Sequence, residues 1–310
     1  MTKLQDSNLG LMINFDVVLL TDSRYVNPKK VNDYISNVLL EDKLIQRALE
    51  NFNLKVHRLS WDDPNFDWSS TQYALFRTTW DYFDRFDEFS TWLKNVSQKT
   101  NLINTESIIK WNIDKHYLKD LKNNGIHCTP TIFIEQGSQK SLAQLHDQNS
   151  WNETVLKPVI SGAARHTYKL NLQNLRLYES IFKELIQKEA FMLQPFQNNI
   201  VEKGELSLIV IDGKFTHAVL KIAKKGDFRV QDDFGGTVHN YKPSSEEIYF
   251  AERAIKACGS KPLYARVDMF YDNDGQLAVS ELELIEPELW FRNNPNAADK
   301  LAFAIKKLIN

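Results

Sequence analysis

Residues 265–284 read ARVDMFYDNDGQLAVSELEL, and this stretch decides how the second half of the chain folds. Two runs of alternating apolar and polar residues flank NDG at residues 273–275, a combination typical of a β-hairpin. Because side chains alternate in a strand, Glu281 and Glu283 point to one face, and Asp268 lies within a few residues of being opposite Glu281. The sequence therefore predicts an antiparallel hairpin with three carboxylates on one face.

Carboxylates gathered on one sheet face repel one another unless a cation neutralises them. Hard oxygen ligands of this kind suit Mg²⁺, which takes one or two carboxylates together with substrate phosphates. Arg266 lies two residues before Asp268 on the same face, and a cation beside acids favours a phosphate site over a plain solvated surface. The alternative, a solvated face that happens to be acidic, stays open for this hairpin taken alone.

The segments around this hairpin predict an α+β arrangement. A second hairpin joins 206–211 to 215–222 through DGK, and helices at 246–257 and 296–308 would cover one face. Before these hairpins in the sequence, the pattern predicts a helix over 106–123 that ends at Gly125, followed by further strands and helices. These are strands at 130–135, 154–159 and 191–196, and helices near Leu142 and over 174–188.

The first hundred residues alternate strand and helix patterns. Strands are expected at 16–20, 55–61, 73–78 and 102–104, with helices at 28–49 and 85–96 between them. This rhythm predicts a parallel sheet with right-handed crossovers, and such sheets bind ligands beyond the carboxyl ends of their strands. Two polar loops, 21–24 and 77–81, follow such strand ends.

Basic residues beside flexible backbone indicate a place for phosphate. Lys157 ends an apolar strand and is followed by the small-residue loop 161–165, where backbone N–H groups can approach phosphate oxygens. Lys115 lies on a predicted helix, and Arg229 lies in a loop that ends in Gly235-Gly236. Taken singly, each of these signals is weak and favours an ordinary surface position, and the Walker A order is absent.

In order along the chain, these pieces resemble the ATP-grasp superfamily, closest to prokaryotic glutathione synthetase and RimK-like carboxylate–amine ligases. The resemblance covers residues 106–310, and more loosely the sheet domain before them. It implies an α/β N-terminal parallel sheet domain followed by an α+β ATP-grasp fold, whose two subdomains grip ATP between them. The expected boundaries are 1–105 for the N-terminal substrate domain, 106–190 for the small lid subdomain, and 191–310 for the subdomain with the metal site.

The resemblance also implies a role for particular residues. Asp268, Glu281 and Glu283 would hold two Mg²⁺ ions, with Mn²⁺ as the other candidate, and Arg266 and Arg229 would be catalytic, near the transferred phosphoryl group. Glu205 would bind the ribose of ATP, and Glu202 is the alternative residue for this role. The expected ATP-binding residues are Lys115, Lys157, Ser161, Gly162, Ala163, Arg165, Gln194, Pro195, Phe196, Glu205 and Lys221.

The implied reaction is ATP-dependent ligation: a substrate carboxylate is phosphorylated, an amine (or thiol) attacks the acylphosphate, and ADP and phosphate leave. The chain departs from the family at three places. Glu283 stands where Asn is common, the loop 161–165 is poor in glycine, and residues 205–207 lack the arginine that glutathione synthetases carry. The missing arginine argues against glutathione itself, whereas the loop 226–231 is similar to that of the cycloserine-forming ligase.

The substrate is expected to be a small amino acid or peptide. Arg77, Trp80 and Asp81 follow a strand end, where arginine could bind a carboxylate and aspartate an amine. The aromatic residues Trp80, Tyr82 and Phe83 are equally compatible with core packing between domains.

Composition and missing motifs argue against several other classes of protein. The 310 residues carry 38 basic and 40 acidic side chains, a net charge of −2, which gives no general attraction for nucleic acid or membrane. No G-x-G-x-x-G follows the first strand, which argues against an oxidoreductase. Two cysteines and a polar start without a targeting segment favour a cytoplasmic protein with reduced thiols. The expected partners are small-molecule substrates, and a homodimer is left open. The runner-up function is a catalytically silent, regulatory nucleotide-binding module.

Overall fold

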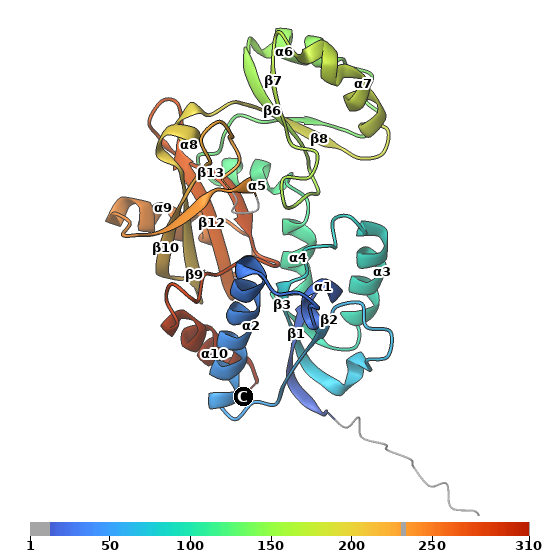
Figure 1. Ribbon diagram of the computed structural model, residues 1–310, viewed down its shortest axis with the longest axis vertical. Coiled ribbons are helices and arrows are strands. Elements are labelled where there is room, and N and C mark those ends of the chain that lie inside the picture. Colours follow the sequence, from blue (N-terminus) through green and yellow to red (C-terminus); the bar gives the residue numbers. More distant parts are fainter. Residues whose placement is uncertain (1–12, 231–233, 310) are drawn as a thin grey trace, which may run out of the picture.

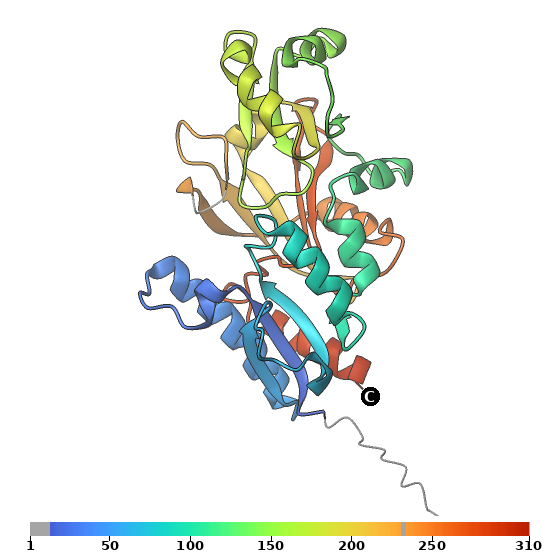
Figure 2. The same cartoon turned by 90° about the vertical axis from the view of Figure 1, so that its right-hand side faces the viewer.

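The computed structural model describes residues 13–230 and 234–309. The chain forms three tiers, each built around one sheet, and Figures 1 and 2 show them stacked along the long axis. Residues 1–12, on which the expectation about a targeting segment rests, lie outside the described residues, as does the end of the 226–231 loop. Among the described residues, no helix is long and apolar enough to cross a membrane.

The N-terminal tier is a parallel sheet whose two faces are both buried, as its apolar strands predict. In β1, Val17 and Leu19 join a core shared with α2 and α10, whereas Val18 and Leu20 join a core shared with α3. The strand order is β2 (Val56–Ser60), β1 (Phe15–Thr21), β3 (Thr71–Thr78), β4 (Asn101–Ile103). The helices are α1 (Ser23–Val26), α2 (Asp33–Asn51), the 3₁₀ turn η1 (Trp68–Ser70), α3 (Phe86–Val96) and α10 (Asn296–Ile309).

The lid tier is a small antiparallel sheet covered by two helices (Figure 1). Its core includes Leu142 of α6, Phe182 of α7 and Phe191 of β8, all nearly inaccessible to solvent. The strand order is β5 (Ile132–Ile134), β8 (Phe191–Pro195), β6 (Glu153–Pro158), β7 (Tyr168–Asn171), and the helices are α6 (Leu142–Asn149) and α7 (Leu175–Leu185).

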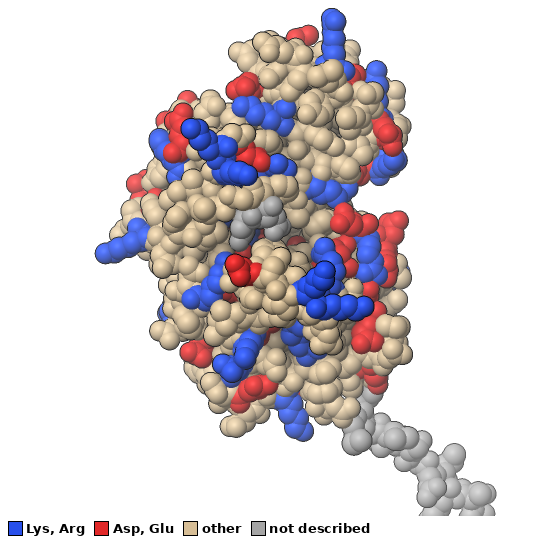
Figure 3. Space-filling model, viewed as in Figure 1, with Lys and Arg blue, Asp and Glu red and all other residues tan. Residues whose placement is uncertain are grey.

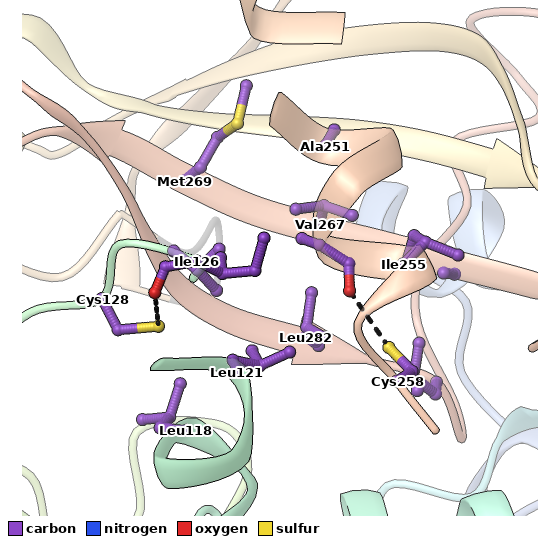
Figure 4. Close-up of a cluster of buried hydrophobic side chains, with 14 of the residues drawn as sticks. Leu118, Leu121, Ile126, Cys128, Ala251, Ile255, Cys258, Val267, Met269 and Leu282 are labelled. Carbon is purple, nitrogen blue, oxygen red and sulfur yellow. Dashed lines mark hydrogen bonds between the residues drawn. The ribbon is translucent and has the colours of Figure 1, made fainter. Parts of the chain in front are cut away.

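The central tier is an antiparallel sheet that contains both predicted hairpins. Its order is β11 (Thr237–Tyr241), β10 (Lys214–Ile222), β9 (Glu205–Ile211), β12 (Tyr264–Tyr271), β13 (Leu277–Glu283). Its helices are α4 (Glu106–Asn112), α5 (Tyr117–Asn123), α8 (Asn198–Lys203) and α9 (Ser245–Lys256). Figure 4 shows the core between the sheet and α5 and α9, where Cys128 and Cys258 are buried free thiols, as expected.

Three elements differ from the sequence-based expectation. The helix expected over 106–123 is broken into α4 and α5, because the Lys115 backbone N–H donates to the Val159 carbonyl at 3.0 Å. Helix α2 begins after Asn32 rather than at Pro28, because the Asn32 side chain accepts the Ile35 N–H. Helices α9 and α10 do not cover one face of the central sheet as expected: α9 packs on the face of β9 that carries Leu208, whereas α10 packs on α2 and on the opposite face, which carries Ile209.

Charged side chains of both signs intermingle on the face shown in Figure 3. Neither sign forms a continuous patch on that face, which agrees with the near-neutral net charge of −2.

Candidate functional site

Two cavities lie side by side where the three tiers meet. The first cavity, of about 210 Å³, is bounded by the lid sheet and the central sheet. The second cavity, of about 240 Å³, is bounded by the central sheet and the N-terminal tier. Molecules bound in the two cavities would meet at a shared wall, which consists of Lys115, Ser161, Gly162, Ala163, Arg266, Glu281 and Glu283.

The first cavity gathers most of the residues that the sequence singled out for nucleotide and metal. Three of the others lie elsewhere: Lys221 lines the second cavity, Arg165 is bound to the Glu189 carboxylate, and Glu202 is exposed on α8. Those that line the first cavity are Lys115, Lys157, Ser161, Gly162, Ala163, Gln194, Pro195, Phe196, Glu205, Arg229, Arg266, Asp268, Glu281 and Glu283.

The three carboxylates come together through the register of the acidic hairpin, in which Asp268 pairs with Glu281 and Arg266 with Glu283. Asp268 accepts hydrogen bonds from Ser207 Oγ at 2.5 Å, Lys221 Nζ at 3.1 Å and the Arg266 guanidinium at 2.8 Å. Burial alone would raise the pKa of Asp268, but Arg266 and Lys221 outweigh burial and hold that pKa below its usual range. Asp268 is therefore ionised at neutral pH.

Glu281 and Glu283 differ in how far nearby positive charges balance their negative charge. Lys115 Nζ lies 3.0 Å from Glu281 Oε1. Burial alone would raise the pKa of Glu281, but the charges of Lys115 and Lys157 outweigh burial and lower that pKa. Glu283 is bonded to Arg266, yet burial and the neighbouring carboxylates raise the pKa of Glu283 to about 7. The positive charge of Arg266 therefore does not offset the combined effect of burial and the neighbouring carboxylates on Glu283.

This donor set fits a magnesium ion by its chemistry, because every candidate ligand is a hard carboxylate oxygen. Within residues 13–230 and 234–309 no three His, Cys, Asp or Glu side chains are close enough to hold one metal ion. Arg266 pairs with both Asp268 and Glu283, and Lys115 and Lys221 pair with Glu281 and Asp268 respectively. The raised pKa of Glu283 indicates that a further cation near it would be stabilised. Asp268, Glu281 and Glu283 would hold the ion.

Lysines and the small-residue loop form the side of the first cavity that suits phosphate. Lys115 is only 6% exposed and donates from Nζ to the Ser161 carbonyl at 2.6 Å. Burial lowers the pKa of Lys157, which Glu281 partly opposes. Ala163 and Ala164 have φ of 48° and 53°, so the loop turns sharply without glycine at these two positions.

Aromatic and hinge residues form the opposite side of the first cavity. The Phe196 ring meets Phe228 edge-on with ring centres 6.0 Å apart, and the Gln194 side chain donates to Thr131. Arg229 is ion-paired with Asp227 and lies over the Phe234 ring. This side of the cavity therefore combines apolar rings with the backbone of Gln194, Pro195 and Phe196.

Only one of the three expected substrate residues, Trp80, lines a cavity. Arg77 is 0% exposed, lies 3.8 Å from Asp42 and packs on the Phe291 ring, so it is a buried core residue and not a substrate contact. Asp81 accepts from the Trp61 indole at 2.7 Å and lines neither cavity. Trp80 lines the second cavity, and its indole N–H donates to the Glu286 carbonyl at 2.9 Å.

The sequence analysis missed most of the second cavity. Its wall away from the first cavity combines the start of the chain with the segment after β13, and includes Arg24, Tyr25, Tyr34, Glu286, Glu288 and Trp290. Trp290 packs its ring 5.0 Å from the Arg266 guanidinium. The signal for this wall was the run of glutamates that continues past the acidic hairpin in residues 281–288.

Comparison with known families agrees with this geometry. A family model for the ATP-grasp domain of prokaryotic glutathione synthetase matches residues 119–264, and one for the N-terminal domain of D-cycloserine synthetase DcsG matches residues 17–104. Residues 119–264 are an ATP-grasp domain. Members of the ATP-grasp family generally use ATP and Mg²⁺. The chain is 28% identical over 293 residues to the cycloserine biosynthesis protein DcsG of Streptomyces lavendulae, covering 88% of this chain and 93% of the relative.

Solved structures show the same fold. The crystal structure of D-cycloserine synthetase DcsG matches this chain with a TM-score of 0.83 and 24% identity, covering 95% of this chain and 99% of the other. D-alanine–D-alanine ligase from Bacillus anthracis matches with a TM-score of 0.64 and 14% identity, over 95% and 97% of the two chains. The expected fold, an α/β sheet domain followed by an ATP-grasp fold, is confirmed.

Proposed function

We propose that this protein joins a substrate carboxylate to an amine through an acylphosphate, with release of ADP and phosphate. The observation that supports the proposal best is the shared wall, where Lys115, Arg266 and two glutamates separate a cavity suited to a nucleotide from a second cavity. A phosphoryl group transferred from one cavity to the other must cross this wall. Cations there stabilise the charge that develops on the phosphoryl group where water is excluded.

Particular residues supply the positioning. Lys115 and Lys157 would bind the β- and γ-phosphates, with backbone N–H groups of residues 161–163 above them. Gln194, Pro195 and Phe196 would hold the adenine, and Glu205, paired with Lys221 at 2.5 Å, lies where a ribose would follow. Arg266 would hold the acceptor carboxylate in line with the transferred phosphoryl group, with Arg229 on the opposite side.

The carboxylates Asp268, Glu281 and Glu283 would bind two magnesium ions, as predicted. When bound, these ions neutralise negative charge on the phosphates. Arg266 and Lys115, which pair with the carboxylates in this structure, would then turn toward the phosphate and the acceptor.

The relatives favour a small amino-acid-derived or peptide substrate. D-cycloserine synthetase and D-alanine–D-alanine ligase are named for small amino-acid products, and another structural neighbour, the ligase PsnB, was solved with a precursor peptide. The second cavity, of about 240 Å³, has room for a single small residue.

The test is phosphate release from ATP and Mg²⁺ in the presence of a panel of D- and L-amino acids, with hydroxylamine added to trap an acylphosphate as its hydroxamate. We expect stimulated release and hydroxamate formation with at least one amino acid, and neither with the Lys157→Ala variant. Tight nucleotide binding without release under any condition would instead favour the silent nucleotide-binding module.

A further inference from the structure

Aromatic rings form one wall of the second cavity. The Trp80 ring meets Tyr25 edge-on at 5.8 Å between centres and lies 6.4 Å from Tyr34. The hydrogen bond from its indole to the Glu286 carbonyl fixes Trp80 against the segment after β13. Ring faces of this kind attract a cation, especially where water is excluded.

An acid, Glu286, lies in the same wall. Tyr82, which is only 5% exposed, donates its hydroxyl to the Glu286 carboxyl. In the part of the chain that the structure describes, no lysine, arginine or histidine forms an ion pair with Glu286. Its neighbours differ, because Glu283 is paired with Arg266 and Glu288 with Arg292.

The surroundings of Glu286 penalise its negative charge. Burial, and then the charge of Glu283, raise the pKa of Glu286 to about 8. A ligand cation placed beside Glu286 would remove this penalty, whereas a ligand anion would increase it. The same cavity is lined by Lys115, whose charge partly opposes the raised pKa of Glu286, and by Arg266, and these two cations suit a carboxylate.

We infer that the second cavity binds the substrate as a zwitterion, with the ammonium group at Glu286 and the carboxylate at the shared wall. The inference rests on the proposed function, because it assigns the orientation of the substrate whose carboxylate is phosphorylated. Glu286 sets the specificity for an amino acid over the corresponding hydroxy acid. The Trp80 ring and the Tyr82 hydroxyl hold Glu286 and the ammonium group in place.

A purely structural role for Glu286, as the acceptor of the Tyr82 hydroxyl, would not distinguish an ammonium group from a hydroxyl group on a ligand. The test therefore compares matched pairs: D- and L-alanine against D- and L-lactate, and D- and L-serine against D- and L-glycerate. Binding is measured by calorimetry with Mg²⁺ and a non-hydrolysable ATP analogue already bound. Phosphate release gives KM and kcat for the same compounds.

Wild-type protein should bind at least one amino acid roughly ten- to hundredfold more tightly than its hydroxy acid, the range for a charged hydrogen bond. Glu286→Gln should lose this preference by raising KM for the amino acid alone, with affinity for the ATP analogue unchanged within about twofold. Glu286→Asp keeps the charge and should retain part of the preference. Glu246→Gln, an exposed acid on α9 outside both cavities, is the matched control.

Two results would overturn the inference. One is a Glu286→Gln variant that keeps the wild-type preference. The other is a wild-type protein that binds the nucleotide but none of the amino acids more tightly than their hydroxy acids. Failure of the proposed function looks different, since the wild-type protein would then release no phosphate with any carboxylate.

Discussion

A methyl group added at Gly162 would collide with the N-terminal tier. An ideal Cβ at Gly162 lies 2.5 Å from Phe83 Cε1 and 2.9 Å from Cδ1, far inside contact distance. Phe83 is 7% exposed and packs edge-on against Tyr82, so its ring has little room to retreat. The loop 161–165 must therefore move away from Phe83, and its backbone N–H groups move with it.

The magnitude follows from the cost of overpacking, about 1–3 kcal/mol. If the substitution destabilises the observed loop conformation by this free energy, the Kd for a non-hydrolysable ATP analogue in Gly162→Ala rises roughly 5- to 150-fold. Each tenfold change in Kd corresponds to about 1.4 kcal/mol. Calorimetric titration measures this, and the melting temperature checks that the variant is folded. Phe83→Leu makes room for the methyl group, so the double variant should recover most of the lost affinity relative to Phe83→Leu alone. Wild-type affinity in Gly162→Ala would refute the contact between the loop and Phe83.

Three further perturbations test other parts of the site. Lys157→Ala should weaken binding of the same analogue by about 1.5–3 kcal/mol, the scale of a charged hydrogen bond; an unchanged Kd, as expected for the exposed Lys140→Ala control, would remove Lys157 from the phosphate site. Glu281→Gln should abolish Mg²⁺-dependent phosphate release while the melting temperature stays near that of the wild type, and retained release would contradict the metal assignment. Because the pKa of Glu286 is raised to about 8, the folded wild-type protein holds a proton that the unfolded chain loses, and stability falls as pH rises from about 5 to 8. Glu286→Gln should not lose this stability, so its melting temperature should gain on the wild type across that window, and a constant difference would contradict the assignment.

The acidic hairpin could be predicted because its information is local. Alternation and the turn at residues 273–275 predict that Asp268 lies within a few residues of being opposite Glu281, and the structure confirms this. The exact pairing of Asp268 with Glu281 depends on a register shift between Asp268 and Met269, which the sequence did not indicate. The second hairpin could be predicted for the same reason, and the parallel sheet could be predicted because strand and helix patterns alternate along the first hundred residues.

The substrate side could not be predicted, because its contacts are non-local. Arg77 shares a strand face with Leu75, which packs toward α2, and its neighbour Asp42 comes from that helix. The aromatic wall joins Tyr25 and Trp80 to Glu286, which lies more than two hundred residues further along the chain than either.

The most direct measurement is a thermal-shift titration with ATP, with and without Mg²⁺. At a hundredfold excess over Kd, a bound nucleotide stabilises the fold by about 2.7 kcal/mol, which raises the melting temperature by several degrees. We expect this rise, and we expect it to be larger with Mg²⁺ because Asp268, Glu281 and Glu283 then bind the ion. No rise with ATP in either condition would contradict the assignment of the first cavity to a nucleotide.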